Sequence, residues 1–568
     1  MMIHKIAISE EKLDNIFSSH IRRVNLISEE FEGYQNLAEG DKKALQYLVR
    51  ASKIMNDVAM EQDHPQNLSL KKELEENSAQ SPHASKALRL FNSLGGASGH
   101  NGIDIEPIEI FEGVHLLKGK NFYPHDLSIE SFHQILKRML QSGKTQEVKK
   151  ILSARTMVRY DNTGDLKAID YTEYFAPQFS AIANDLELAA HYSTNHEFNE
   201  FLSWQAQALL QNNEDMDMLA DKHWALMQDT PLEFTISREN YEDEMTGTVL
   251  EDEELKSMLA EVGIEPIAKD TLGARVGVVN SQGTKLLLNF KEQMKLLAKQ
   301  MPLSDKYHQT ITDGEGVKQT MVDVDLASLC GDFAQCRGGI TTAENLPNDD
   351  KLAIKMGGGR RNVYHRQVRM SYDSERDKKL LDALVVPELH QYYSHEADHV
   401  FVIGHENGHS LGPDSSYKDA LGNYRHIIEE NKADVVSIAM MPEYVKSGVI
   451  DELMLKKIYT TWIIMRSLSK SKPIESHRVG DLIHFNYLLE HGVIIFNSER
   501  KINIDFDKLP EVINRLLTET IEVQLSRSPQ VAKTWIDKYT KWNDLHIYIA
   551  DTLQSLGVKN YIEIRTYF

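Results

Sequence analysis

Two short motifs constrain the fold of this chain more than any other feature. They read His-Glu-Asn-Gly-His at 405–409 and Glu-Glu-Asn-Lys-Ala-Asp at 429–434. On a helix, His405 and His409 lie four residues apart on one face, where both rings can bind the same ion. Glu406 is the neighbour that can reach a water molecule held by that ion. The first motif therefore predicts a helix that carries a metal ion.

The second motif supplies the third ligand that such a site needs. Glu430 and Asp434 are also four residues apart, so a second helix can present both to the metal helix. We expect Glu430 to bind the metal and Asp434 to accept a hydrogen bond from the distal ring nitrogen of a ligating histidine. Glu429 points elsewhere and is either an indirect partner of the site or a solvated neighbour. Two histidines and one glutamate with an open position are typical of catalytic zinc, so we expect one Zn²⁺ per chain.

A competing match to the same pattern, His395 to His399, stands ten residues earlier. On one continuous helix the two pairs would face about 80° apart, at about 100° per residue. The apolar run 400–403 precedes the later pair, whereas Tyr392, Tyr393 and Ser394 precede the earlier one. Because apolar packing fixes metal ligands, the pair at 405–409 is the predicted site.

Two glycines flank the predicted ligands within the metal helix. Gly404 and Gly408 each cost about 1 kcal/mol relative to alanine inside a helix. Glycine at such positions permits the close approach of another backbone or of a substrate. We therefore expect a close contact along this part of the helix.

The balance of charge and the two cysteines narrow the class of protein. The chain has 63 basic and 85 acidic residues, a net charge of −22, which argues against nucleic acid and anionic membranes as partners. The same charge favours capture of cationic peptide termini. Cys330 and Cys336 offer no disulfide framework, which indicates a reducing compartment. The first residues lack the pattern of a signal peptide, and no run of about 18 apolar residues occurs, so we expect a cytoplasmic protein with no membrane contact.

Apolar periodicity predicts a helix-rich chain with a few strands. Helices are expected over the ranges 38–60, 128–153, 172–212, 250–262 and 285–300, and from 377 onward the pattern is mainly helical. Strands are expected at 231–236 and 274–280. The glycine-rich segment 92–107 predicts a loop or a linker between elements, and GGGRR at 357–361 predicts a turn.

Five segments, taken together, resemble the dipeptidyl peptidase III family of zinc metallopeptidases, in its compact bacterial form. They are ENYEDE (239–244), ENLPNDDKL (344–352), GHENGHSLGP (404–413), EENKAD (429–434) and SHRVGDLIHFNYLLEHG (476–492). Their order agrees with the family, and the likeness covers roughly residues 215–495.

Several positions depart from the family pattern. The metal motif is a pentapeptide where the family usually has one more residue. Asn431 and Lys432 stand where cysteine and arginine are common, and Asp434 stands where glutamate is common. Arg275 stands where relatives often have a small or acidic residue. These departures bear on substrate range and efficiency more than on the metal site.

The resemblance implies an α+β fold with two lobes around a wide cleft. One lobe is mainly helical and binds zinc, and the other is mixed, with a small β-sheet or barrel. The expected division is 1–282 (mixed lobe with N-terminal helices), 283–319 (helical segment of the zinc lobe), 320–385 (substrate loop returning to the mixed lobe) and 386–568 (helical zinc-binding lobe).

The resemblance also implies roles for residues outside the two metal motifs. Tyr241 and His477 are expected to donate hydrogen bonds to the oxyanion of the tetrahedral intermediate. Glu239, Asn345 and Asn348 are expected to hold the free amino terminus and first peptide groups of the substrate, since a carboxylate suits an ammonium and amides suit the backbone.

The expected activity is release of dipeptides from the free N-terminus of peptides, with Glu406 as general base. Two alternatives remain open. One is an endopeptidase of the gluzincin type, for which a glutamate about twenty residues after the second histidine is also suitable. The other is a peptide-binding protein with a remnant zinc site.

Overall fold

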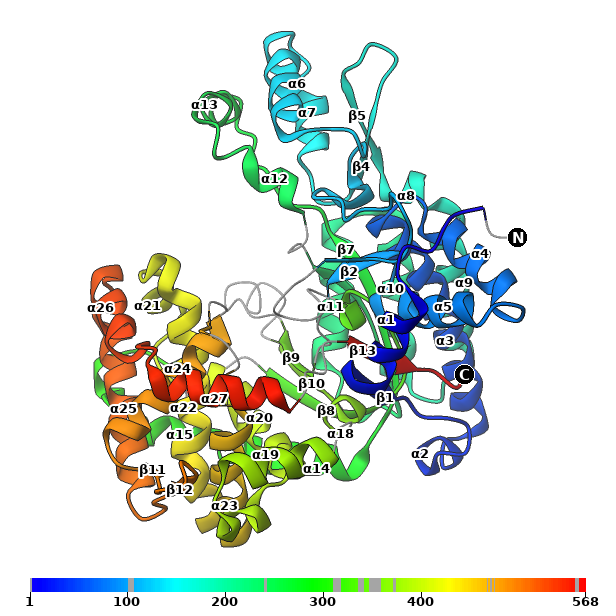
Figure 1. Cartoon of the computed structure of the whole chain (residues 1–568). Helices are drawn as coiled ribbons and strands as arrows, with labels where there is room; N and C mark the ends of the chain where they lie inside the picture. Colours follow the sequence, from blue (N-terminus) through cyan, green and yellow to red (C-terminus); the bar gives the residue numbers. More distant parts are fainter. Residues whose placement is uncertain are drawn as a thin grey trace. The chain divides into compact units, whose positions relative to one another are not determined.

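The computed structural model describes most of the chain. Its described residues are 3–100, 107–239, 243–309, 318–335, 342–346, 359–370, 374–466, 468–469, 472–473, 476–556 and 561–568. The chain divides into two compact units (Figure 1). The first unit comprises Met1–Val279, Val324–Thr341 and Lys559–Phe568, and the second comprises Asn280–Asp323 and Thr342–Val558. The four-segment division expected from the sequence stays a prediction.

The first unit contains helices and several small sheets. Its helices are α1 (Glu10–Asn15), α2 (Glu32–Gln35), α3 (Glu39–Asp63), α4 (Asn67–Ser78), α5 (Pro82–Leu94), α6 (Ile129–Gln141), α7 (Thr145–Ile151), α8 (Tyr171–Tyr174), α9 (Ala176–Tyr192), α10 (His196–Gln211), α11 (Glu214–Leu226), α12 (Glu244–Thr248), α13 (Glu253–Glu261) and α16 (Asp332–Gln335). Its strands are β1 (Ile21–Asn25), β2 (Ser98–His100), β3 (Pro107–Glu109), β4 (Thr156–Tyr160), β5 (Leu166–Asp170), β6 (Leu232–Glu239), β7 (Thr271–Val279), the part of β8 (Lys318–Gly331) from Val324 onward, and β13 (Tyr561–Arg565).

Strand β7 is the central strand of this unit. It pairs antiparallel with β6 on one side and with β8 on the other. Eight of its nine residues are buried, as expected for a near-continuous apolar run between two neighbours. The exception to its apolar character is Arg275, which is fully buried and lies 3.6 Å from Glu233 of β6. The position flagged in the sequence thus holds a buried ion pair within the sheet.

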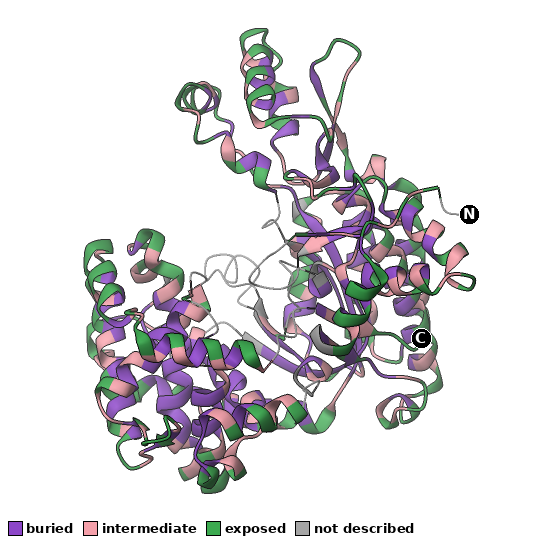
Figure 2. Ribbon diagram, viewed as in Figure 1, coloured by how far each residue is buried: buried purple, intermediate pink, exposed green. Residues whose placement is uncertain are grey.

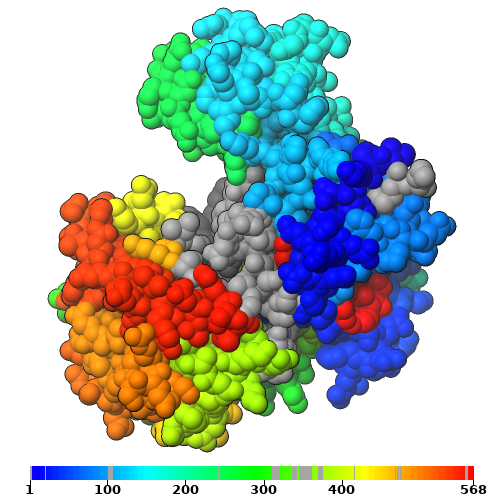
Figure 3. Space-filling view, in the orientation of Figure 1, coloured from blue at the N-terminus to red at the C-terminus, as the bar shows by residue number. Residues whose placement is uncertain are grey.

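Two pairs of distant segments lie side by side in the first unit. The terminal strands β1 and β13 pair in parallel, with Ile21 opposite Tyr561. Helix α13 packs on α6, and the surface they form is visible in green and cyan in Figure 3.

The second unit is mainly helical. Its helices are α14 (Ser281–Glu292), α15 (Met294–Gln300), α18 (Arg366–Met370), α19 (Ser374–Leu384), α20 (His395–His409), α21 (Ser415–Asp419), α22 (Arg425–Lys446), α23 (Glu452–Thr461), α24 (Ser476–Glu490), α25 (Leu509–Leu525), α26 (Pro529–Tyr539) and α27 (Asp544–Ser555). Its strands are β9 (Ala343–Leu346), β10 (Gly359–His365), β11 (Ile494–Phe496) and β12 (Ile502–Ile504), with the first residues of β8.

Helix α22 lies in the interior of this unit. It packs against α20, α23, α24 and α25, and fourteen of its 22 residues are buried. Figure 2 shows the result as a purple interior with green outer helix faces. Helix α20 begins at a Ser394 cap, whose hydroxyl accepts from the Ala397 amide, and its apolar run 400–403 is buried. The two helices that carry the sequence motifs are therefore both core elements.

A glycine contact brings α20 and α22 unusually close. A Cβ added at Gly408 would lie 2.7 Å from the carbonyl oxygen of Ala433, and one added at Gly404 would collide with the hydroxyl of Ser437. The Ser437 hydroxyl also donates to the carbonyl of Phe401 at 2.7 Å. The close backbone approach expected from the two glycines is therefore present, and its partner is α22.

Most of the expected architecture is confirmed, and several local predictions are wrong. The α+β class, the two-part organisation and the strands β6 and β7 are as expected. The stretch 128–153 is two helices, because Gly143 adopts a left-handed φ of 78° between them. The stretch 285–300 belongs to two helices that meet at Gln293, whose amide bonds three residues back to Phe290. The stretch 172–212 is divided among α8, α9 and α10, and the expected loop or linker at 92–107 contains the strand β2.

The sequence predicted a turn at 357–361. The structure describes the last three of these residues, and they form a strand and not a turn. Gly359, Arg360 and Arg361 lie in β10, where Arg361 pairs with Leu346 of β9. Arg361 is fully buried and donates to the hydroxyl of Thr320 at 3.2 Å. A buried arginine with a hydrogen-bond partner overrides the local preference of glycine for turns.

The cysteines and the apolar helices were also considered in the sequence, and the structure describes part of both. Cys330 is a buried free thiol whose pKa burial raises to about 11, whereas Cys336 lies outside the described residues. Of the helices among the described residues, none combines the length and apolarity that crossing a membrane requires.

Replacing Gly408 with alanine should destabilise the protein. The new Cβ meets backbone atoms of Ala433, which cannot rotate away, so we expect a loss of about 1–3 kcal/mol in the free energy of unfolding. Urea unfolding followed by circular dichroism measures it. Gly480→Ala in α24 is the matched control, because its nearest neighbour would be 3.6 Å away, an ordinary contact. Equal stability of the two variants would contradict a close α20–α22 contact.

Candidate metal centre

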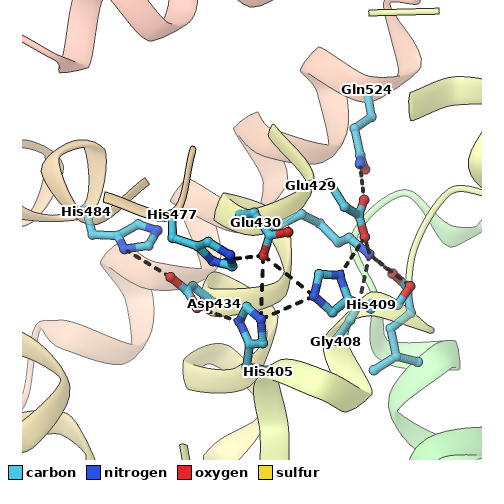
Figure 4. A network of polar contacts seen from close by, with 11 residues as sticks. His405, Gly408, His409, Glu429, Glu430, Asp434, His477, His484 and Gln524 are labelled. Carbon is cyan, nitrogen blue, oxygen red and sulfur yellow. Dashed lines mark hydrogen bonds and ion pairs between the residues drawn. The ribbon is translucent and has the colours of Figure 1, made fainter. Parts of the chain in front are cut away.

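Helices α20 and α22 bring three potential ligands together (Figure 4). His405 and His409 occupy the last two turns of α20, on one face. Glu430 lies in the second turn of α22 and faces them. The Nε2 atoms of the two histidines are 3.2 Å apart, and Glu430 Oε2 lies 3.5 Å from the first and 3.6 Å from the second.

These distances fit a zinc ion. Zinc binds imidazole nitrogen and carboxylate oxygen at about 2.0–2.1 Å in tetrahedral sites, so adjacent ligand atoms lie about 3.3–3.4 Å apart. The three measured separations are 3.2, 3.5 and 3.6 Å. Borderline nitrogen and oxygen donors also match the preference of zinc. The donor set and its spacing therefore fit the group that the sequence predicts.

The surroundings of the Glu430 carboxylate also fit a bound cation. Its Oε2 atom is buried and accepts no hydrogen bond of acceptable geometry from the described residues. A buried carboxylate oxygen in that state is costly unless a cation binds it. His477, in the first turn of α24, places Nδ1 3.1 Å from the same oxygen. His477 is more than half exposed, so it lies at the open side of the ligand group.

Asp434 holds the ring of His405 from behind. Its Oδ1 lies 2.6 Å from Nδ1 of His405, which directs Nε2 toward His409 and Glu430. Burial alone lowers the pKa of His405, but the Asp434 carboxylate outweighs burial and raises it to about 9. On the far side, fully buried His484 lies 3.9 Å from Asp434 Oδ2, and burial lowers the pKa of His484 to about 4.

Glu429 holds the ring of His409 in the corresponding way. Its Oε1 lies 3.0 Å from Nδ1 of His409 and 2.9 Å from Nζ of Lys432. Its Oε2 accepts a hydrogen bond from Gln524 of α25 at 3.2 Å. Burial alone raises the pKa of Glu429, but Lys432 and His409 outweigh burial and hold that pKa far below its usual range. Glu429, for which the sequence left two alternatives, is thus buried beside a histidine.

The earlier histidine pair lies on the same helix but in different surroundings. His395 Nε2 lies 2.7 Å from Asp377 of α19, and His399 lies 4.0 Å from Asp323. Within the described residues the two histidines do not join a third ligand in a compact group.

The structure describes only some of the other residues that the sequence predicted for the site. Glu406 is buried on α20 next to His405. Glu239 ends β6 and Asn345 lies in β9, but their side chains fall outside the described residues, as do Tyr241 and Asn348 altogether. The roles of these residues stay predictions.

Three residues of this centre were not found as contributors from the sequence. Lys432, Gln524 and His484 are buried and surround the partners of the two histidines. The spacing of Glu429 and Lys432, three apart on one helix, was the available signal for the lysine. Gln524 and His484 come from other helices, and local sequence carries no signal for them.

Comparison with known proteins supports the fold. No family model matches the chain. The structure of DPP III from Caldithrix abyssi matches with a TM-score of 0.77 and 22% identity, covering 95% of this chain and 97% of that one. The structure of dipeptidyl-peptidase III from Corallococcus sp. strain EGB matches with a TM-score of 0.72 and 20% identity, covering 99% and 97%. The chain therefore has the dipeptidyl peptidase III fold, as the motifs led us to expect.

A relative by sequence has a different name. "Nudix hydrolase 3" of Arabidopsis thaliana is 24% identical over 561 residues, which are 89% of this chain and 68% of that protein. The match thus leaves about a third of the plant protein outside it.

Metal analysis of histidine variants tests which pair binds. His405→Ala and His409→Ala should lose the single equivalent of zinc, because each removes one of three ligands. His395→Ala and His399→Ala are controls on the same helix and should keep it. Inductively coupled plasma mass spectrometry of the dialysed proteins gives the metal content. Loss of zinc only from the His395 and His399 variants would show that the earlier pair, and not His405 and His409, binds the metal.

Zinc affinity should rise with pH up to about 9. The pKa of His405 is raised to about 9, so in the metal-free protein its ring is protonated at neutral pH and zinc must displace that proton. One competing proton weakens apparent affinity about tenfold for each pH unit below the pKa. Competition with a chromophoric chelator between about pH 6 and pH 9 measures this.

The Asp434→Asn variant is the control for this pH dependence. It removes the carboxylate that raises the pKa of His405, so the rise in affinity should end at lower pH. An affinity for zinc that does not change between neutral pH and about 9 in the unaltered protein would contradict the His405–Asp434 pairing.

Proposed function

We propose that this chain is a zinc-dependent exopeptidase that releases dipeptides from the free N-terminus of peptides. The observation that carries the proposal is the convergence of His405, His409 and Glu430 at 3.2–3.6 Å on helices that also bury Glu406, the residue after His405. A zinc ion held by these three residues would keep one position for water or substrate, as catalytic zinc does. The dipeptidyl peptidase III fold supports the choice of peptide as substrate.

His405, His409 and Glu430 would hold the zinc ion. When bound, zinc supplies a Lewis acid that polarises a carbonyl and makes water acidic near neutral pH. Asp434 and Glu429 keep the distal N–H of each histidine engaged, so both rings present Nε2 to one point.

Glu406 acts as the general base in this proposal. It follows His405 directly on α20 and is buried, and its negative charge is among those that raise the pKa of the His405 ring against the effect of burial. It takes a proton from the attacking water and passes it to the leaving amine, which balances the charge over the two steps.

Residues outside the metal motifs set the position of the cut. Tyr241 and His477 donate hydrogen bonds to the developing oxyanion. Glu239 pairs with the substrate ammonium, and Asn345 and Asn348 bind its first peptide groups. Capture of the amino terminus directs cleavage to the second peptide bond. The family resemblance of the motifs supports these roles, together with the exposed position of His477 near Glu430.

The cytoplasm is the proposed compartment. A buried free thiol at Cys330 and an acidic chain that needs no disulfide agree with a reducing environment.

An assay on dipeptide naphthylamides tests the proposal against its alternatives. A substrate with a free N-terminus should be cleaved after the second residue, and chelator should abolish the activity. The same substrate with an acetylated N-terminus should be resistant. Cleavage of blocked, longer peptides would favour the endopeptidase of the gluzincin type. Zinc retention with binding but no cleavage of any peptide would favour a binding protein with a remnant site.

Glu406→Gln should separate catalysis from metal binding. The amide keeps the shape but cannot accept the proton, so kcat should fall by several orders of magnitude while zinc content is unchanged. Glu430→Ala should instead lose zinc. Steady-state kinetics with metal analysis distinguishes the two, and activity of Glu406→Gln within about tenfold of the parent would disprove its role as base.

A further inference from the structure

Lys432 is a buried lysine at the junction of the two metal-site helices. Its side chain is 1% exposed, and its Nζ lies 2.9 Å from Oε1 of Glu429. The same ammonium donates to the carbonyls of Gly408 and Leu411 at 2.8 Å each, with His409 O at 3.4 Å. One cation on α22 therefore holds the end of α20.

The carbonyls it contacts lie at the negative end of α20, where the Leu411 amide also donates to the Gly408 carbonyl at 3.2 Å. The last carbonyls of a helix have no acceptor role within the helix, and the helix dipole makes that end negative. Helix α20 ends at His409 with Ser410 as its cap residue in the right-handed region, without the glycine that often closes a helix. Lys432 adds to these backbone hydrogen bonds a positive charge supplied by the neighbouring helix. The turn that Lys432 closes carries the ligand His409.

Lys432 also fixes the carboxylate behind that ligand. Glu429 Oε1 is shared between His409 Nδ1 and Lys432 Nζ, and Glu429 Oε2 is held by Gln524. Figure 4 shows Glu429 between His409 and Gln524. Both oxygens are thus engaged, which leaves the carboxylate one orientation toward the His409 ring.

The other histidine is supported differently. Asp434 Oδ1 lies 2.6 Å from His405, but its Oδ2 lies 3.9 Å from His484, beyond hydrogen-bond distance. Glu429, behind His409, forms an ion pair with a lysine that also caps α20. Among the contacts with described residues, Asp434, behind His405, has no such lysine partner.

We propose that Lys432 is a positioning residue that sets how tightly the site holds zinc through His409. The inference rests on the proposed metal site but not on the identity of the substrate. Lys432 orients Glu429, which orients the His409 ring, and it closes the turn on which that ring stands. Without the ammonium, Glu429 would pull more strongly on the Nδ1 proton and could leave its present orientation, and the end of α20 would fray.

Lys432→Met tests the proposal, because it keeps the length of the side chain and removes the charge. We expect the Kd for zinc to rise 10–100-fold, as for other residues that support metal ligands indirectly. Lys432→Arg restores a buried cation and should return the Kd to within a few-fold of the parent. Competition with a chromophoric chelator gives Kd, and the visible spectrum of the Co²⁺-substituted protein reports a change in ligand geometry.

Ser437→Ala is the matched control. It also removes a side-chain hydrogen bond from α22 to the backbone of α20, at Phe401, and among the described residues this hydrogen bond involves neither a ligand nor a partner of a ligand. It should lower the unfolding temperature while leaving the Kd for zinc within about threefold. A shift in Kd for Ser437→Ala equal to that of Lys432→Met would show that any loosening of the helix pair weakens zinc, and would overturn the proposal.

The remaining outcomes are also decisive. A Lys432→Met protein that binds zinc as the parent does, with an unchanged Co²⁺ spectrum, overturns the proposal. Should that variant fail to fold, Lys432→Gln keeps one donor and takes its place, and failure of both would assign Lys432 to folding alone. Failure of the unaltered protein to bind zinc would reject the proposed function, whereas zinc binding without peptide cleavage would leave the role of Lys432 intact.

Discussion

The close packing of α20 on α22 is the contact on which the rest of the candidate site depends. Gly404 and Gly408 leave room for the backbone at Ala433 and the side chain at Ser437, so the two helices meet with little between them. Ligands from different helices converge only if the helix axes are held to a few tenths of an ångström, since metal–ligand distances tolerate about 0.2 Å. The glycines give up helix propensity at two positions, and the packing of α22 in the core of its unit offsets that loss.

Around this contact the structure gathers an unusual density of buried charge. Glu406, Glu429, Asp434 and Lys432 are all buried, and Glu430 has a buried oxygen without a hydrogen bond from the described residues. A folded protein keeps such groups only when they are paired or when a cation completes the set. A bound ion that prefers the folded form would stabilise it in proportion to its affinity. The same ligand group therefore links the proposed chemistry to the stability of the second unit.

The sequence predicted those parts of the site that depend on local geometry. Residues four apart on a helix share a face, and this alone brought His405 to His409 and Glu430 to Asp434 before any tertiary contact was known. The contributions of Gln524 and His484 were beyond prediction, because they come from helices whose packing is decided by the whole core. The surroundings of Glu429 were undecided for the same reason.

The errors in the fold have a similar origin. Glycine-rich GGGRR was expected to turn, but burial of Arg361 between strands decided its conformation. The break at Gly143 follows from a backbone angle that apolar periodicity does not report. Pattern reading found where helices and strands exist, and tertiary contacts decided where some of them end.

The parallel pairing of β1 with β13 has a consequence for how the chain is made. Arg23 and Arg89 both pair with Glu563, so the first unit draws a strand and an ionic anchor from residues more than 470 positions away. On a ribosome, all of the second unit, to Val558, emerges before Lys559–Phe568 can join the first. The helical unit that carries the candidate metal centre can thus assemble while the first unit still waits for its last strand. The pairing of β1 with β13 closes a loop of more than 500 residues, and contacts between residues so far apart in the sequence form late in folding.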